Sequence, residues 1–110
     1  MEQPVIVLVT VPSQKEGERI GRMLVESRLA ACVNLIPHLL SIYRWEGKIQ
    51  EEGEFLLMIK TTADRFAELR EKVKRIHSYE VPEVLALPVL DGNTDYMEWV
   101  YRETRPESAS

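Results

Sequence analysis

Residues Ser41–Ile49 read SIYRWEGKI, and this stretch decides how the rest of the chain can fold. Its first five side chains alternate in character, which is typical of a β-strand with two different faces. Glu46 and Gly47 then form the kind of two-residue turn that reverses a strand into a hairpin, and Lys48 begins the return. The stretch therefore predicts the tip of a β-hairpin, and the other elements can be placed outward from it.

Both strands of this hairpin are predicted to be long. The first runs from Ala30 to Trp45 and is interrupted by Pro37, which cannot donate a ladder hydrogen bond and so indicates a bend, a bulge or a sheet edge. The second runs to about Thr61. Because a small sheet does not require a hairpin of this length, we expect its overhanging part to pair with another subunit.

Two βα units flank the hairpin. Pro4–Val11 is an apolar, β-branched run that predicts a strand buried on both faces. Ser13, with Glu16 three residues later, predicts the start of a first helix, and Thr61 with Asp64 predicts the start of a second. The second helix is expected to end near residues 77–78. The last predicted elements are a strand at 84–87, a turn and helix cap at 91–94, and a short helix at 96–100.

The order of these elements is βαββαβ followed by a helix. This order predicts an α+β fold of the ferredoxin-like class, in which two helices cover one face of a four-stranded antiparallel sheet. The strands are apolar on both sides, so the second face needs a cover, which the terminal helix and neighbouring subunits could provide. Residues 1–110 are expected to form a single domain, with a polar tail at 105–110 that frays.

Composition excludes several classes of protein. The single cysteine rules out an intramolecular disulfide, and the apolar runs are too short to span a membrane. The net charge is -4 with scattered Lys and Arg, so no nucleic-acid partner is expected. The N-terminus lacks the basic start of a signal peptide, which predicts a cytoplasmic protein. Glu far exceeds Asp, which favours a thermophilic source and a thermostable protein.

No catalytic motif is present, so we expect a protein that is not an enzyme. Cys32 lies between Ala and Val on a predicted strand, and the more frequent role of such a cysteine is that of a small buried hydrophobe. A nucleophilic thiol would need an adjacent base, which the local sequence does not offer. The acidic residues Glu51, Glu52 and Glu54 are predicted to form a solvated strand face.

His77 and Glu80 are the candidate metal ligands. They lie in the segment HSYEVPE, residues 77–83, which leaves the C-terminus of the predicted second helix. Neutral imidazole nitrogen and carboxylate oxygen form a ligand set that suits Cu²⁺, with Zn²⁺ as the alternative. The competing interpretation is structural, because a histidine at this position is stabilised as a cation by the helix dipole.

Tyr43 and Trp45, beside Arg44 and Lys48, form an aromatic and basic group near the hairpin tip. Such residues could stack on nucleic acid, but the acidic composition argues against that use. Aromatic side chains and arginine are also enriched at protein interfaces, so Tyr43 and Trp45 are predicted to be interface residues.

Taken together, the motifs resemble those of the CutA family of divalent-cation tolerance proteins. The resemblance runs from Val5 to Trp99. Its landmarks, in chain order, are Thr10-x-Pro12-Ser13, Leu29-Ala30-Ala31-Cys32-Val33-Asn34, Ser41-x-Tyr43-x-Trp45-x-Gly47-Lys48-Ile49, Lys60-Thr61, His77-x-Tyr79-Glu80-x-Pro82-Glu83, Pro88, Tyr96 and Trp99.

The resemblance implies a ferredoxin-like subunit in a tight homotrimer that acts in tolerance of divalent cations, above all copper, by binding and not by catalysis. Two positions depart from the family. Ser78 stands where the family loop usually has proline, and Val9 stands where some members have a cysteine. Without that soft ligand, Cu²⁺ or Zn²⁺ held by His77 and carboxylates is favoured over copper(I).

Three functions remain open from the sequence. The first is a trimeric divalent-metal-binding protein with ligands at His77 and Glu80, completed by a neighbouring subunit or water. The second is a trimer that senses a small molecule or binds a partner, in the general arrangement of the P-II nitrogen-signalling proteins. The third is an enzyme that uses Cys32 or His77.

Overall fold

The computed structural model describes residues 2–106 and places four strands in one antiparallel sheet, in the order β2-β3-β1-β4. The elements, in chain order, are β1 (Pro4–Val11), α1 (Gln14–Glu26), β2 (Cys32–Trp45), β3 (Lys48–Thr62), the short 3-10 helix η1 (Ala63–Arg65), α2 (Phe66–Ile76), β4 (Val84–Pro88) and α3 (Thr94–Glu103). The predicted ferredoxin-like βαββαβ fold with a terminal helix is therefore confirmed.

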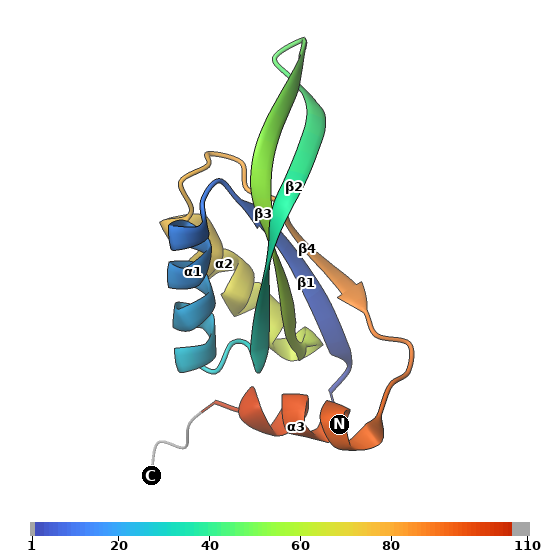
Figure 1. The fold of residues 1–110 in the computed structure, drawn as a ribbon. Helices are drawn as coiled ribbons and strands as arrows, with labels where there is room; N and C mark the ends of the chain where they lie inside the picture. The colour runs from blue at the N-terminus through green and yellow to red at the C-terminus, as the bar shows by residue number, and fades with distance from the viewer. Residues whose placement is uncertain (1, 107–110) are drawn as a thin grey trace.

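The core lies between the sheet and the two helices that cover one of its faces (Figure 1). The central strand β1 turns Val5, Val7, Val9 and Val11 toward the helices, and all four side chains are buried. The fully buried residues packed against them from α1 and α2 are Ile20, Leu24, Leu69 and Val73. Alternation along β1 thus divides its apolar side chains between a closed core and a second face.

Helix α1 begins at the predicted residue and lies close to the sheet. The Ser13 hydroxyl accepts a 3.2 Å hydrogen bond from the backbone N–H of Glu16, as the N-cap pattern predicts. A Cβ added to Gly17 would lie 2.8 Å from Leu35 Cδ1, and one added to Gly21 would lie 3.2 Å from Val33 Cγ1. The two glycines therefore allow the helix to approach β2.

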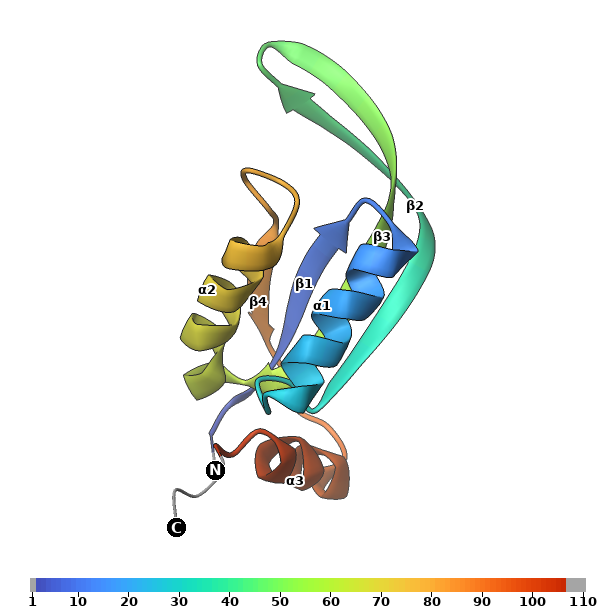
Figure 2. The ribbon, with the colours of Figure 1, turned by 90° about the vertical axis from the view of Figure 1, so that its left-hand side faces the viewer.

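The long hairpin has the features predicted for it. Trp45 pairs with Lys48, and the two turn residues Glu46 and Gly47 have φ angles of 51° and 79°. The register between β2 and β3 shifts between Ile36 and Leu39, which confirms the irregularity expected at the proline between them. The hairpin extends past the ends of β1 and β4 (Figure 1), and in Figure 2 it curves toward the loop that follows α2.

The predicted start of the second helix is wrong by a few residues. Thr61 is fully buried, and its hydroxyl donates a 2.7 Å hydrogen bond to the Leu29 carbonyl oxygen instead of capping a helix. The reason is that Thr61 still belongs to β3, where its pairing with Val5 turns it into the core. The chain then passes through η1 before α2 begins at Phe66.

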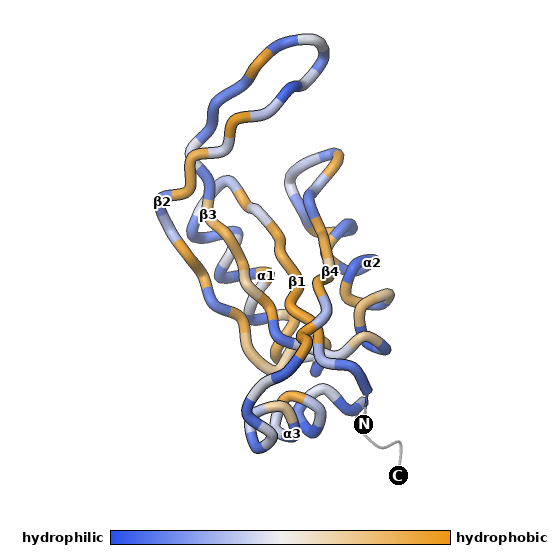
Figure 3. Tube along the Cα trace, turned by 90° about the vertical axis from the view of Figure 1, so that its right-hand side faces the viewer, coloured by the Kyte–Doolittle hydropathy of each residue, from blue (hydrophilic) through white to orange (hydrophobic). Residues whose placement is uncertain are grey.

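The second face of the sheet is largely uncovered in this chain. Helix α3 lies across one end of the sheet, so it covers less of this second face than the sequence predicts (Figures 1 and 2). Leu85 and Leu87 of β4 are 55% and 49% exposed, and they lie beside Leu8 and Ile6 of β1. Figure 3 shows the apolar character of these strands from this side. An apolar sheet face is thus left for another contact.

The end of α3 is held more firmly than predicted. Arg105, expected in a frayed tail, bonds to both carboxylate oxygens of Asp64 at 2.9 and 3.1 Å, and its guanidinium lies 4.1 Å from the Tyr101 ring centroid. The sequence does not reveal this contact, because Asp64 lies 41 residues earlier in the chain. Residues 107–110 of the predicted tail lie outside the described residues.

Candidate functional site: an acidic cleft under the hairpin

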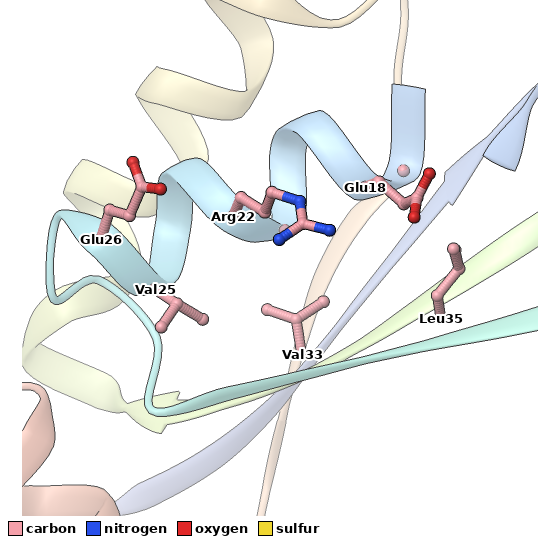
Figure 4. A pocket seen from close by; sticks show the side chains of 8 residues that line it. Glu18, Arg22, Val25, Glu26, Val33 and Leu35 are labelled. Carbon is pink, nitrogen blue, oxygen red and sulfur yellow. The ribbon is translucent and has the colours of Figure 1, made fainter. Parts of the chain in front are cut away.

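Two surface cavities are candidate binding sites. The smaller, of about 370 Å³, lies between α1 and β2. Figure 4 shows Val33 and Leu35 pointing from β2 toward the helix, with Glu18, Arg22 and Glu26 on the helix side. Because its charged residues have opposite signs and it holds no histidine, cysteine or hydroxyl group, this groove offers little chemistry.

The larger cavity, of about 800 Å³, lies between the hairpin and the loop that joins α2 to β4. Strand alternation and register turn one set of hairpin side chains toward it. These are Ser41, Tyr43 and Trp45 from β2, with Gln50, Glu52 and Glu54 from β3; Ile42 and Thr10 also border the cavity. The loop contributes Ser78, Tyr79, Glu80, Val81 and Glu83. We call this cavity the acidic cleft, because four carboxylates line it.

The loop side of the cleft is anchored through His77. Its imidazole is buried, with Nε2 2.8 Å from the Thr10 carbonyl oxygen and Nδ1 accepting a 3.0 Å hydrogen bond from the backbone N–H of Tyr79. Both ring nitrogens thus have a backbone hydrogen-bond partner. The protein itself therefore uses both ring nitrogens.

Glu16 also holds this loop. Its carboxylate accepts a 2.9 Å hydrogen bond from the backbone N–H of Ser78 and lies 3.5 Å from Nδ1 of His77. Burial acts to raise the pKa of Glu16, but the hydrogen bonds from Ser78 together with nearby positive charge, that of Arg19 included, outweigh it, so the pKa is lowered and the group stays ionised. A proline at position 78 could not make this contact, because it has no backbone N–H.

Glu54 and Tyr79 join the two sides of the cleft. The Tyr79 hydroxyl donates a 2.7 Å hydrogen bond to Oε2 of Glu54, whose residue is only 7% exposed. Burial, followed by the hydrogen bond and the negative charge of Glu54, raises the pKa of Tyr79. The phenol therefore remains a hydrogen-bond donor throughout the neutral range.

Negative charge accumulates across the rest of the cleft. Burial, with the nearby charge of Glu54, raises the pKa of Glu83. Burial and a hydrogen bond with Glu52 raise the pKa of Tyr43. Within residues 2–106, no Lys, Arg or His side chain lies within 4.0 Å of Glu52, Glu54 or Glu83 as an ion-pair partner. The described part of the chain thus supplies no neutralising cation to these three carboxylates.

The structure places the predicted ligands His77 and Glu80 differently. Glu80 is exposed and lines the cleft, whereas His77 is buried behind it and would have to break a hydrogen bond before a nitrogen could bind a metal. No three His, Cys, Asp or Glu side chains of the described residues lie close enough together to hold one metal ion. Val9 is fully buried in the core, so the family's alternative cysteine position does not face this cleft.

Other predicted residues can also be located. Tyr43 and Trp45 are 37% and 46% exposed on the hairpin and form part of the cleft wall. Cys32 is partly exposed at the start of the edge strand β2, so its expected core position is wrong. Glu54, predicted to lie on a solvated strand face, is instead buried at the cleft, so that prediction is wrong. Its spacing of two residues from Glu52 and four from Gln50 indicates a shared strand face, but nothing local shows that the loop covers Glu54.

Comparison with known proteins gives a consistent result. The family model described as CutA1 divalent ion tolerance protein matches residues 5–103. The divalent-cation tolerance protein CutA of Thermus thermophilus is 50% identical over 90% of this chain and 96% of its own length. Protein CutA of Mus musculus is 52% identical over 93% of this chain, which spans 58% of the mouse protein.

A solved structure agrees with the sequence comparison. The crystal structure of CutA1 from Oryza sativa superposes with a TM-score of 0.92 at 45% identity, covering 94% of this chain and 95% of that chain. A curated rice relative, 46% identical over 92% of this chain and 57% of its own length, is named as chloroplastic. Among residues 2–106, no helix has the length and apolar character needed to cross a membrane.

Proposed function

The chain belongs to the CutA1 divalent ion tolerance family, and we propose on this basis that it binds divalent cations in the acidic cleft and does not act as an enzyme. The observation that carries the proposal is the set of four cleft carboxylates, which have no ion-pair partner among the described residues. Carboxylate oxygen binds divalent ions, and among common divalent metals Cu²⁺ forms the most stable complexes with a given ligand set. Cu²⁺ is therefore the proposed ion, with Zn²⁺ as the alternative.

Glu80 is the proposed ligand on the loop. It is exposed at the cleft, and no hydrogen bond or ion pair holds its carboxylate elsewhere among the residues that the structure describes. His77 would instead position the loop, because both of its nitrogens are engaged. Direct ligation by His77, as the sequence predicts, requires Nδ1 to give up the Tyr79 backbone N–H.

Electron paramagnetic resonance of the Cu²⁺-loaded protein separates these two roles. Ligation by oxygen alone gives no coupling to imidazole nitrogen. The chain has only two histidines, so His38→Asn is a matched control for His77→Asn. Nitrogen coupling that disappears in His77→Asn and persists in His38→Asn would show that His77 is a ligand and would overturn the positioning role.

The proposed assembly is a homotrimer in the cytoplasm. Two features support self-association: the apolar sheet face with Leu85 and Leu87 exposed, and the hairpin that extends beyond the sheet. Since no three ligands converge within the described part of one chain, a second copy or water would complete a metal site. Light scattering is expected to give three times the chain mass of 12.7 kDa, whereas a monomeric mass would contradict the assembly.

Isothermal titration calorimetry tests the metal proposal directly. Saturable Cu²⁺ binding of micromolar or tighter affinity is expected, with Zn²⁺ weaker and Mg²⁺ much weaker. Glu80→Gln should reduce Cu²⁺ affinity at least tenfold, whereas Glu46→Gln at the hairpin turn, outside the cleft, should not change it. Weak, unsaturable heats with every metal would overturn the proposal.

A further inference from the structure

The buried carboxyl group of Glu54 in the acidic cleft has no ion-pair partner among residues 2–106. Glu54 is 7% exposed, and its one hydrogen-bond partner among the described residues is the neutral phenol of Tyr79. A carboxylate held away from water is unfavourable in its ionised form unless a cation or several hydrogen bonds compensate it. Because Glu54 lines the cleft, a cation that compensates it can come from outside the chain.

The size of the cleft indicates what kind of cation fits. Its volume of about 800 Å³ lies within the range of about 300–1,000 Å³ typical of sites for small organic ligands. A divalent ion would fill only a small part of it. Tyr43, Trp45 and Tyr79 contribute aromatic surface to its walls. Aromatic faces attract organic ammonium groups and also pack against the methylene groups that carry them.

The spacing of the carboxylates also favours an organic cation over a single metal ion. Four glutamates line the cleft, yet no three His, Cys, Asp or Glu side chains within residues 2–106 converge closely enough to hold one ion. Glu52 and Glu54 come from β3, and Glu80 and Glu83 come from the facing loop. A negative charge distributed in this way is matched by a ligand whose positive charges are also separated.

We propose that the acidic cleft binds a linear alkyl polyamine. One ammonium group lies at Glu54, the remaining ammonium groups lie at the outer carboxylates of the strand and the loop, and the methylene chain lies against Tyr43 and Trp45. This ligand goes beyond the proposed metal function, and it needs no metal to bind. The same chemistry could be presented by lysine side chains of another protein, and the experiment includes an arm for that source.

Calorimetric titration with spermidine, in the presence of a chelator, tests the proposal on the protein in its native assembly. Saturable binding is expected, and n-butylamine, with one charge, should bind at least tenfold more weakly. Glu54→Gln keeps the shape and the acceptor for Tyr79 but removes the charge, so spermidine affinity should fall at least tenfold. Trp45→Leu should reduce it several-fold through loss of aromatic contact.

Glu51→Gln is the matched control. Glu51 is the neighbour of Glu52 on β3, but alternation turns it to the opposite face and it does not line the cleft. Its substitution removes the same charge from the chain and should leave spermidine affinity unchanged. Light scattering on each variant verifies that the assembly is intact, and ligand-free Glu54→Gln should melt at an equal or higher temperature than the parent protein.

The outcomes are distinct. Absence of saturable heat with millimolar spermidine would overturn the inference, as would an equal loss of affinity in Glu51→Gln and Glu54→Gln, which would indicate diffuse charge attraction. Binding of an oligolysine peptide without binding of spermidine would overturn it in favour of a protein ligand. Spermidine binding without saturable Cu²⁺ binding would support the polyamine inference and overturn the metal proposal. Saturable Cu²⁺ binding without spermidine binding would overturn the polyamine inference and support the metal proposal.

Discussion

The Nε2 atom of His77 lies 2.8 Å from the carbonyl oxygen of Thr10, 67 residues earlier in the chain. This hydrogen bond ties the loop after α2 to the end of the central strand. It makes the histidine part of the scaffold of the acidic cleft, and it leaves the exposed glutamates to face a ligand.

Replacing His77 should therefore destabilise the fold. His77→Ala removes a buried ring and leaves the Thr10 carbonyl and the Tyr79 N–H without their partner. A loss of about 2–4 kcal/mol in the free energy of unfolding is expected. Urea denaturation measures it, with the exposed His38→Ala as the control. A change in His77→Ala below about 0.5 kcal/mol would show that the hydrogen bonds contribute little.

The hairpin turn should be sensitive at one glycine and tolerant at another. Gly47 has a φ of 79°, whereas Gly53 in the same hairpin has ordinary backbone geometry and nothing within 4 Å of an added Cβ. Gly47→Ala should cost about 1 kcal/mol, and Gly53→Ala should be neutral or slightly stabilising. Chemical denaturation of the two variants measures the difference, and equal effects would contradict the assigned turn.

The clamp between Asp64 and Arg105 should make stability depend on pH at the acidic end. The hydrogen bond from Arg105 is the largest influence on the pKa of Asp64 and lowers it, against the opposing effect of burial. The unfolded chain takes up this proton near pH 4. The contribution is therefore present above about pH 4 and is lost as the pH falls through the lower pKa of the folded state.

Asp64→Asn should accordingly cost about 1 kcal/mol at pH 7, after allowance for the partial exposure of both side chains. The difference from the parent protein should disappear at strongly acidic pH. Glu103→Gln is a control, because its 3.9 Å contact with Arg102 is highly exposed and should contribute almost nothing. If the difference in free energy of unfolding between the parent protein and Asp64→Asn did not change with pH, the ionic contribution would be ruled out.

Tyr79 should make the stability of the fold depend on pH at the alkaline end, where stability is lost as the pH rises. Its pKa is raised in the folded state by burial and by Glu54, while the unfolded chain loses the phenolic proton near pH 10. The resulting stability is present below about pH 10 and is lost as the pH rises further. Tyr79→Phe should cost about 1–2 kcal/mol at pH 7 and should lose stability less steeply above pH 10. If the free energies of unfolding of Tyr79→Phe and of the parent protein fell in parallel above pH 10, the prediction would be contradicted.

The fold and much of its local detail follow from the sequence alone. The turn at Glu46 and Gly47, the irregularity after Ile36, the N-cap at Ser13 and the order of strands and helices are all local or periodic features. Each depends on the backbone preferences of neighbouring residues or on a repeat along one element. A single sequence expresses such preferences directly, and the family resemblance rests on the same residues.

The site required the tertiary structure. The sequence identifies His77, Glu80, Tyr43 and Trp45 as notable, but not that His77 turns inward while Glu80 faces the cleft. It also places Glu54 on a solvated face, although Tyr79, 25 positions later, bonds to it across the cleft. Whether a polar side chain binds a ligand or the protein depends on partners brought together from distant elements. That arrangement is decided by how the hairpin curves over the loop, which no local pattern records.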